Sequence, residues 1–228
     1  MEKQTIISTD GLYRQYKAGN TVVNAVKNIS MTVKEGELTV LRGRSGSGKT
    51  TLLNLLSTLD MPTQGTIYYH DEDITRFSEQ KKDQLRREEI GIIFQSVALM
   101  SQMTAYENVE FGLRIAGMPY KEYKPLVQKY LNLVGLGNRM THLPGELSGG
   151  EQQRIAIARA IAHRPKVVFA DEPTAQLDTA TALHVVKLLK ELIETEKITV
   201  VMTTHDPNMM EIADTVYSLQ DGEIVDAY

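Results

Sequence analysis

With 228 residues and 42% hydrophobic content, the chain is long enough to bury the core of one large domain, or of one domain with a subdomain. Its formal net charge of −4 argues against a nucleic-acid-binding surface, which normally carries a basic excess. Because the chain has no cysteine, disulfides, thiolate metal sites and cysteine nucleophiles are excluded.

The first third of the chain predicts antiparallel strands, followed by a strand, a loop and a helix. Residues 22–33 alternate between apolar and polar side chains and have turn residues on both sides, which is typical of an antiparallel sheet. Residues 38–41 form an apolar run that indicates a buried strand. Leucines at helical spacing predict a helix over 50–59, and the mixed charges of 80–89 indicate a solvated helix face.

The rest of the chain alternates between strands and helices. Residues 90–94 predict a short strand, and apolar residues at helical spacing over 106–138 predict a helical region with glycine breaks. We then expect a helix opened by the glycine pair, a strand over 167–170, a helix over 180–194, a strand over 198–203, a helix over 207–213 and two strands joined at Asp221-Gly222. This alternation implies a mostly parallel sheet that ends in a hairpin.

A glycine-rich loop follows the strand predicted over 38–41. Glycines let backbone N–H groups converge on phosphates, while a lysine reaches the β- and γ-phosphates and a hydroxyl ligates Mg²⁺. A chance glycine-rich turn is the alternative, but the flanking strand and helix are those that the motif requires. The predicted ATP-binding set is Gly43, Arg44, Ser45, Gly46, Ser47, Gly48, Lys49, Thr50 and Thr51.

These elements predict the α/β fold of a P-loop NTPase, with a mostly parallel core sheet, a small antiparallel β subdomain and a helical subdomain. We expect one domain over residues 1–228. The core and the antiparallel sheet would come from about 1–95 and 163–228, and the helical subdomain from about 96–162.

Two carboxylates follow the strand predicted over 167–170. They lie at its C-terminal end, where open α/β sheets bind ligands. We expect Asp171 to hold Mg²⁺ and Glu172 to act as the general base on the attacking water. Taken alone, the pair could instead cap a helix, and the phosphate loop makes the catalytic interpretation stronger.

Two further side chains follow predicted strands of the same sheet. His205 could contact the γ-phosphate and position water, and Gln95 could bind Mg²⁺ or water. A structural role is the alternative for each. Tyr16 is predicted to stack on adenine, with Tyr13 as its competitor and packing within the small sheet as the alternative.

The stretch Leu147 to Arg154 predicts a second anion-binding helix N-terminus, formed by Ser148, Gly149 and Gly150. The phosphate loop already accounts for the chain's own nucleotide. This surplus half-site therefore implies that a second copy of the chain supplies the other nucleotide.

Together, these motifs make nearly the whole chain resemble the ATP-binding cassette (ABC) family. The resemblance identifies four segments: residues 43–50 as the Walker A loop, 167–171 as the Walker B strand, 147–151 as the signature and 175–178 as the D-loop with Asp178. It also identifies three single residues: Gln95 as the Q-loop glutamine, His205 as the switch histidine and Tyr16 as the A-loop aromatic. It implies an ATPase that uses ATP and Mg²⁺ and works as a head-to-tail dimer. Each ATP would lie between the Walker residues of one copy and the signature of the other.

Residues 59–65 and 94–109 resemble the macrolide-exporter and lipoprotein-release subfamily, which includes antimicrobial-peptide-resistance transporters. Two departures stand out. Glu151 replaces the commoner glutamine, and we expect its acid to point away from the partner's ATP. Ala175-Gln176 replaces the commoner residues before Leu177-Asp178, which could alter communication between the two ATP sites.

The resemblance implies a membrane permease as partner, with an extracytoplasmic adaptor as a further candidate and no nucleic acid. No apolar run reaches the roughly 18 to 20 residues needed to cross a bilayer, and no signal-peptide pattern opens the chain. We therefore expect a cytoplasmic protein held peripherally at the inner face of the membrane by its permease. An ATP-gated regulator of cell-wall enzymes is the alternative, whereas the acidic balance counts against a DNA-repair or translation cassette.

Overall fold

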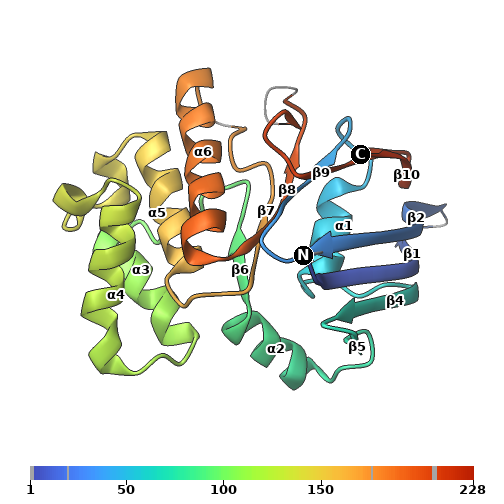
Figure 1. The fold of residues 1–228 in the computed structure, drawn as a ribbon, viewed down its shortest axis with the longest axis horizontal. Coiled ribbons are helices and arrows are strands. Elements are labelled where there is room, and N and C mark those ends of the chain that lie inside the picture. Colours follow the sequence, from blue (N-terminus) through green and yellow to red (C-terminus); the bar gives the residue numbers. More distant parts are fainter. Residues whose placement is uncertain (1–2, 20, 176, 207–209) are drawn as a thin grey trace. The chain divides into compact units, whose positions relative to one another are not determined.

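A computed structural model describes residues 3–19, 21–175, 177–206 and 210–228 (Figure 1). The chain folds into two compact units. Unit 1 comprises Met1–Arg86 and Thr199–Tyr228, and unit 2 comprises Arg87–Ile198. Within the described residues, no helix is both long and apolar enough to span a membrane.

An antiparallel sheet makes up one part of unit 1. Its strands are β1 (Thr5–Ala18), β2 (Thr21–Lys34), β4 (Gln64–Tyr69) and β5 (Glu72–Asp73), in the order β2-β1-β4-β5. Along the second half of β2, buried residues alternate with exposed ones, so that one face packs on the core. The antiparallel strands predicted near the N-terminus are confirmed, while β4 and β5 were not predicted.

Unit 1 also holds parallel strands. Strand β3 (Leu38–Arg42) lies between β8 (Thr199–Thr204) and β9 (Thr215–Gln220) and is parallel to both, while β10 (Glu223–Ala227) closes an antiparallel hairpin with β9. Strand β8 is buried along its whole length, as expected of a parallel strand covered on both faces. The predicted Asp221-Gly222 hairpin is confirmed.

Helix α1 (Lys49–Leu56) follows β3 through the glycine-rich loop and packs against β8. It ends three residues before the predicted Leu59. Thr58 has a left-handed φ of 60°, and the N–H groups of Leu59 and Asp60 both turn back to the carbonyl of Asn54. Helix α2 (Glu79–Glu88) coincides with the charged run and, despite its charge, buries the side chain of Lys82.

Unit 2 combines two parallel strands with four α-helices, which Figure 1 shows in green to orange. Strand β6 (Ile90–Ile93) pairs in parallel with β7 (Val167–Ala170). Helices α3 and α4 pack against each other and against α5, which also contacts α6. The helical elements are α3 (Ala105–Ile115), α4 (Tyr120–Leu133), α5 (Gly149–Ile161) and α6 (Thr179–Glu196), with short 3₁₀ turns η1 (Gly137–Arg139) and η2 (Pro144–Glu146).

The starts of these helices follow directly from the sequence. Thr104 and Ser148 open α3 and α5 with capping boxes, and the Asp178 carboxylate accepts hydrogen bonds from the first turn of α6. The helix predicted over 207–213 lies partly outside the described residues.

Candidate nucleotide site

The glycine-rich loop 43–50 joins β3 to the first turn of α1. Lys49 is only 5% exposed, and its Nζ donates to the carbonyl oxygens of Gly43 and Arg44, at 2.9 and 3.1 Å. Gly48 has a φ of +100°, and a Cβ there would lie 2.3 Å from the Ala25 carbonyl oxygen. The loop therefore requires glycine at this position for both its conformation and its packing.

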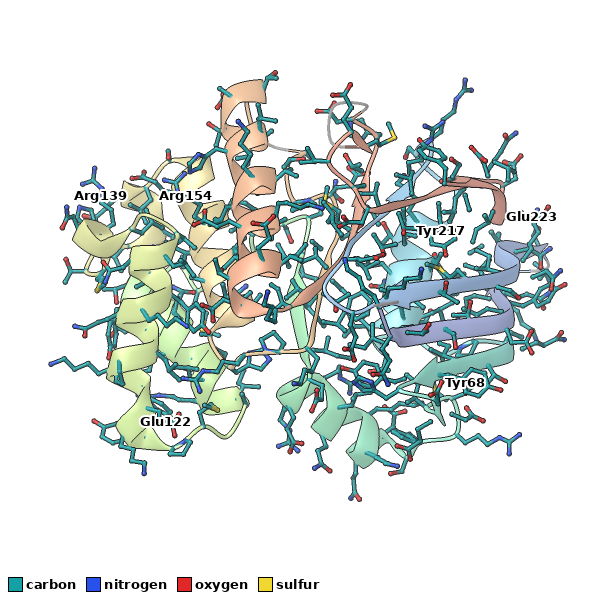
Figure 2. The ribbon with its side chains drawn as sticks, in the orientation of Figure 1. Tyr68, Glu122, Arg139, Arg154, Tyr217 and Glu223 are labelled. Carbon is teal, nitrogen blue, oxygen red and sulfur yellow. The ribbon has the colours of Figure 1, made fainter. Side chains whose placement is uncertain are left out.

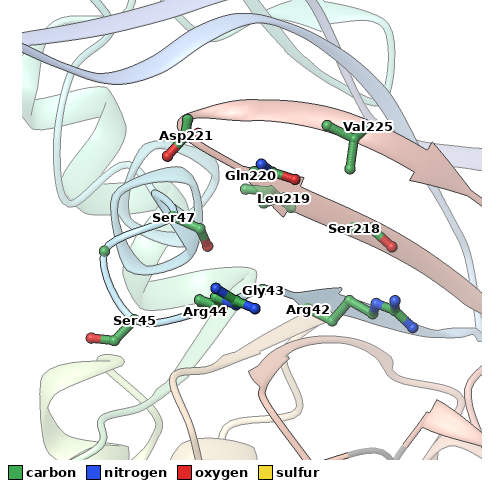
Figure 3. A pocket seen from close by; sticks show the side chains of 11 residues that line it. Arg42, Gly43, Arg44, Ser45, Ser47, Ser218, Leu219, Gln220, Asp221 and Val225 are labelled. Atoms are coloured by element: carbon green, nitrogen blue, oxygen red, sulfur yellow. The ribbon is translucent and has the colours of Figure 1, made fainter.

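A cavity of about 530 Å³ lies beside this loop in unit 1 (Figure 3). Its charged lining residues are Arg42, Arg44 and the acid Asp221, and its other wall comes from strands β9 and β10. The hydroxyls of Ser47 and Ser218, which belong to lining residues, are buried and have no hydrogen-bond partner within the described part of the chain. A buried hydroxyl of this kind is suited to a polar ligand, so the loop's surroundings fit an anionic phosphate.

Tyr16, predicted to stack on adenine, is held by two neighbouring side chains. Its hydroxyl donates to Asp60 Oδ2 at 2.5 Å, and the Arg14 guanidinium carbon lies 4.5 Å from the ring centroid. Arg14 also pairs with Asp60 at 2.6 Å. Tyr16 is 38% exposed, whereas Tyr13 is half-buried, so Tyr16 is the more accessible of the two rings and its stacking on adenine stays a prediction.

His205 also lies in unit 1. It is exposed and directly follows β8, which runs beside β3, the strand that leads into the loop. The next residue, Asp206, donates its backbone N–H to the Thr204 hydroxyl at 3.1 Å. The prediction that His205 lies on a loop after this strand is confirmed.

The predicted acids lie in unit 2, directly after β7. The N–H of Asp171 donates to the Ile93 carbonyl at 2.9 Å, which extends the pairing of β6 with β7. Glu172 has a φ of +42°, a left-handed conformation that a non-glycine residue rarely adopts. Such strain costs about 1–3 kcal/mol and is often stored at functional sites, and eight further non-glycine residues of the described chain share a positive φ.

A small cavity of about 80 Å³ in unit 2 brings three predicted site residues together. Its lining includes Gln95, Glu172 and Gly149. Gln153 lines it as well and was not predicted; its buried Nε2 has no hydrogen-bond partner in the described residues. Its position two residues after Glu151 on the same helix carried no signal by itself, because only the fold shows that this face of α5 borders the cavity.

Arg159 of α5 holds the segment that follows Gln95. Its guanidinium donates to the carbonyl oxygens of Ala98 and Val97, at 2.7 and 3.2 Å. Burial lowers the pKa of Arg159. Helix α5 therefore supports the Gln95 segment at one position and carries the signature residues at its N-terminus.

Ser148, at the start of α5, is bound to Glu151 in a capping box. Glu151 Oε2 accepts from the Ser148 N–H and from its hydroxyl, both at 2.9 Å, and Arg139 Nε lies 3.3 Å from Oε1. The bonds from Ser148 lower the pKa of Glu151. Glu151 therefore folds back onto the N-cap residue, as N3 acids do in capping boxes, and its orientation relative to a partner's ATP stays a prediction.

The two signature glycines differ. A Cβ on Gly150 would lie 2.5 Å from Thr181 Cγ2 of α6, so packing within the unit requires glycine there. At exposed Gly149 a Cβ would meet only Leu177 Cδ2, at an ordinary 3.9 Å. The chain's own fold therefore does not require glycine at 149.

The D-loop prediction rests on Asp178, since Gln176 lies outside the described residues. The Asp178 carboxylate accepts from the N–H groups of Ala180 and Thr181, each at 3.1 Å, and from the Thr181 hydroxyl at 2.6 Å. These hydrogen bonds lower the pKa of Asp178. The carboxylate thus caps α6, whose residue Thr181 faces Gly150.

The predicted residues divide between the two units. Unit 1 holds loop 43–50, Thr51, Tyr16 and His205, and unit 2 holds Gln95, Asp171, Glu172, Ser148 to Gly150 and Asp178. Among the described residues, no group of three or more His, Cys, Asp or Glu could hold a metal. The predicted Mg²⁺ ligands are Thr50, Gln95 and Asp171. Because only Asp171 is one of these four residue types, this finding does not test them.

Comparison with known proteins identifies the same family as the sequence motifs. Residues 26–175 match the ABC transporter family model. The chain is 41% identical to the lipoprotein-releasing system ATP-binding protein LolD of Legionella pneumophila (strain Lens), with 96% of each chain covered. It is 37% identical to the macrolide export ATP-binding/permease protein MacB of Shewanella sp. (strain W3-18-1), over 96% of this chain and 34% of MacB.

The fold comparison agrees with this result. The solved dimeric, post-hydrolysis structure of the ATP-binding cassette MJ0796, bound to ADP and Pi, has a TM-score of 0.90 and 36% identity, and 98% of each chain is covered. The predicted α/β cassette fold is therefore confirmed. The chain belongs to the ABC transporter family.

Proposed function

We propose that this chain is the ATP-binding and ATP-hydrolysing subunit of an ABC transporter, and that two copies hydrolyse ATP at composite sites. The observation that carries the proposal is the exposed Ser148-Gly149 terminus of α5, where the fold itself does not require glycine. A missing side chain with no internal cause leaves room for another molecule to approach the backbone. The phosphate of an ATP held by a second copy is suited to such a helix terminus.

The chain's own ATP would lie on loop 43–50, with Lys49 on its phosphates and Tyr16 against its adenine. The fixed glycine conformation and the buried Ser47 hydroxyl support this placement. Thr50, Gln95 and Asp171 would hold Mg²⁺, which supplies charge neutralisation to the phosphates when bound.

Glu172 would accept a proton from the attacking water, and His205 would position that water against the γ-phosphate. The left-handed backbone of Glu172 supports this role. Asp178 would act by capping α6, whose residue Thr181 packs against Gly150.

The working assembly would be a head-to-tail dimer on a membrane permease, with ATP favouring the closed state and hydrolysis releasing it. The dimeric MJ0796 cassette and the LolD and MacB relatives support this arrangement. We assign the docking of the permease to the helical subdomain of about 96–162. The protein would be cytoplasmic and peripheral. The LolD and MacB relatives support an exporter or lipoprotein-release system, and we further propose a peptide-resistance system as an alternative and an extracytoplasmic adaptor as an additional partner.

The replacement Glu172→Gln tests the catalytic half of this proposal. Loss of the base should slow ATP hydrolysis by about 10²- to 10⁴-fold, while ATP binding persists and the dimer accumulates. Phosphate release measures turnover, and light scattering coupled to gel filtration measures the dimer. Undiminished hydrolysis would refute the role of Glu172.

The replacement Ser148→Arg tests the composite site. A long cation at the half-site should block ATP-driven dimerisation and hydrolysis but leave nucleotide binding to each monomer unchanged. If both activities survive, two copies do not share the ATP in this way.

A further inference from the structure

The Ser148 hydroxyl, the group expected to meet the partner's ATP, already donates its proton within the chain. A serine hydroxyl has one proton to donate, and here that proton points to Glu151 Oε2, 2.9 Å away. The same oxygen accepts the Ser148 backbone N–H at 2.9 Å. One carboxylate oxygen therefore occupies both donors of the signature serine.

The charge on this carboxylate is stable near neutral pH. Hydrogen bonds from Ser148 lower the pKa of Glu151, and the nearby Arg139 lowers it further. Arg139 Nε lies 3.3 Å from Oε1, and half of the Arg139 side chain is exposed to solvent. Figure 2 labels Arg139, which ends the short turn η1.

We propose that Glu151 is a brake on the composite site: it competes with the γ-phosphate of the partner's ATP for the Ser148 hydroxyl, and Arg139 weakens the brake by offsetting its charge. This inference rests on the proposed function, because it assumes that ATP reaches Ser148 from a second copy. The physical cause is the repulsion between a carboxylate and a phosphate that approach the same donors.

A matched control is present in the same unit. Glu107 forms an equivalent capping box at α3, with Oε2 accepting from the Thr104 N–H at 2.7 Å and from its hydroxyl at 2.8 Å. Its pKa is lowered mainly by these bonds. Glu107→Gln thus makes the same chemical change in the same motif, away from the signature.

The experiment measures the ATP concentration that gives half-maximal dimerisation, with Glu172→Gln as the background. Adding Glu151→Gln, which keeps an oxygen for the cap but removes the charge, should lower this concentration about three- to tenfold, as expected for one largely solvated charge. Adding Arg139→Gln should raise it by a similar factor, and Glu107→Gln should not change it. Raising the salt from about 0.05 to about 0.5 M shortens the Debye length about threefold and should shrink both shifts.

The outcomes separate this inference from the proposed function. If the background itself forms no dimer at any ATP concentration, the proposed function fails. If it dimerises but Glu151→Gln leaves the midpoint unchanged, or if Glu107→Gln shifts it equally, the brake is refuted. Opposite, salt-sensitive shifts for Glu151→Gln and Arg139→Gln support it, since loss of a purely structural cap would not produce them.

Discussion

Loop 43–50 and the Ser148-Gly150 segment both place glycines at the start of a helix. The physical reason for having glycine differs between the two segments. In loop 43–50, Gly48 has a left-handed φ and touches the Ala25 backbone. In the second segment, a Cβ on Gly150 would clash with Thr181, while a Cβ on Gly149 would make only an ordinary contact with Leu177. In loop 43–50 the chain itself fills the space beside Gly48, whereas in the second segment the space beside Gly149 is left open.

Some glycines of a motif are therefore needed for folding, and others are available for binding another molecule. A close intramolecular contact explains a glycine by packing, whereas an exposed glycine without such a contact points to an external molecule. The comparison can be tested by adding one methyl group at each position.

The largest effect is expected for Gly48→Ala. The new Cβ would lie 2.3 Å from a backbone oxygen in a left-handed conformation, so we expect a loss of about 2–4 kcal/mol in the free energy of unfolding. Gly46→Ala is the control, because φ is +81° there but no atom lies within 4 Å of the new Cβ. Urea denaturation should show a clearly smaller loss for Gly46→Ala; equal losses would mean that the Ala25 contact is unimportant.

An intermediate effect is expected for Gly150→Ala. The Cβ would clash with Thr181 Cγ2, at a cost of about 1–3 kcal/mol in the free energy of unfolding. Thr181→Ser should restore much of this loss by removing that methyl group while keeping the hydroxyl.

Gly149→Ala should change stability by less than about 0.5 kcal/mol and instead weaken ATP-driven dimerisation. The comparison breaks down if Gly149→Ala unfolds the protein as readily as Gly150→Ala.

A smaller effect is expected from removing the two caps. Ser148→Ala and Thr104→Ala should each lower the free energy of unfolding by about 1 kcal/mol, because each loses an equivalent capping box. Only Ser148→Ala should also raise the ATP concentration needed for dimerisation. A dimerisation defect of the same size in Thr104→Ala would assign the effect to helix stability.

The smallest effect concerns acid pH. The folded-state pKa values of Glu107 and Glu151 lie below those of the unfolded chain, so their stabilisation is present above about pH 4.3 and is lost as pH falls through the folded-state values. Glu107→Gln and Glu151→Gln should therefore each flatten the decline of the melting temperature between about pH 5 and 3. An unchanged slope in both variants would show that these caps do not contribute to acid sensitivity.

Several features were predictable because their causes are local. The strand over 167–170 coincides with β7, and the charged run 80–89 lies almost entirely in α2. The glycine pair marked the start of α5. By contrast, the end of α1 at Leu56 depends on the turn at Thr58 and on hydrogen bonds to Asn54, which the leucine spacing does not encode.

The side-chain network around the sites was less predictable. Glu151 folds onto Ser148 through a local Ser-x-x-Glu capping box, whereas Gln153 emerged only from the lining of a cavity. Arg14 and Asp60, which hold Tyr16, are 46 residues apart in sequence. Contacts between such distant positions follow from packing, and no periodic pattern announces them.

The amino-acid sequence alone was enough to predict the family and the fold class and to name candidate residues for ATP chemistry, because glycines, capping residues and apolar runs act over a few neighbouring positions. The family and the fold are confirmed by comparison. The tertiary structure was needed to show which glycine is required for packing and which is left open, and that Arg139 lies beside Glu151. Both depend on atoms from distant segments, Thr181 of α6 and Arg139 of η1, that folding brings beside the start of α5.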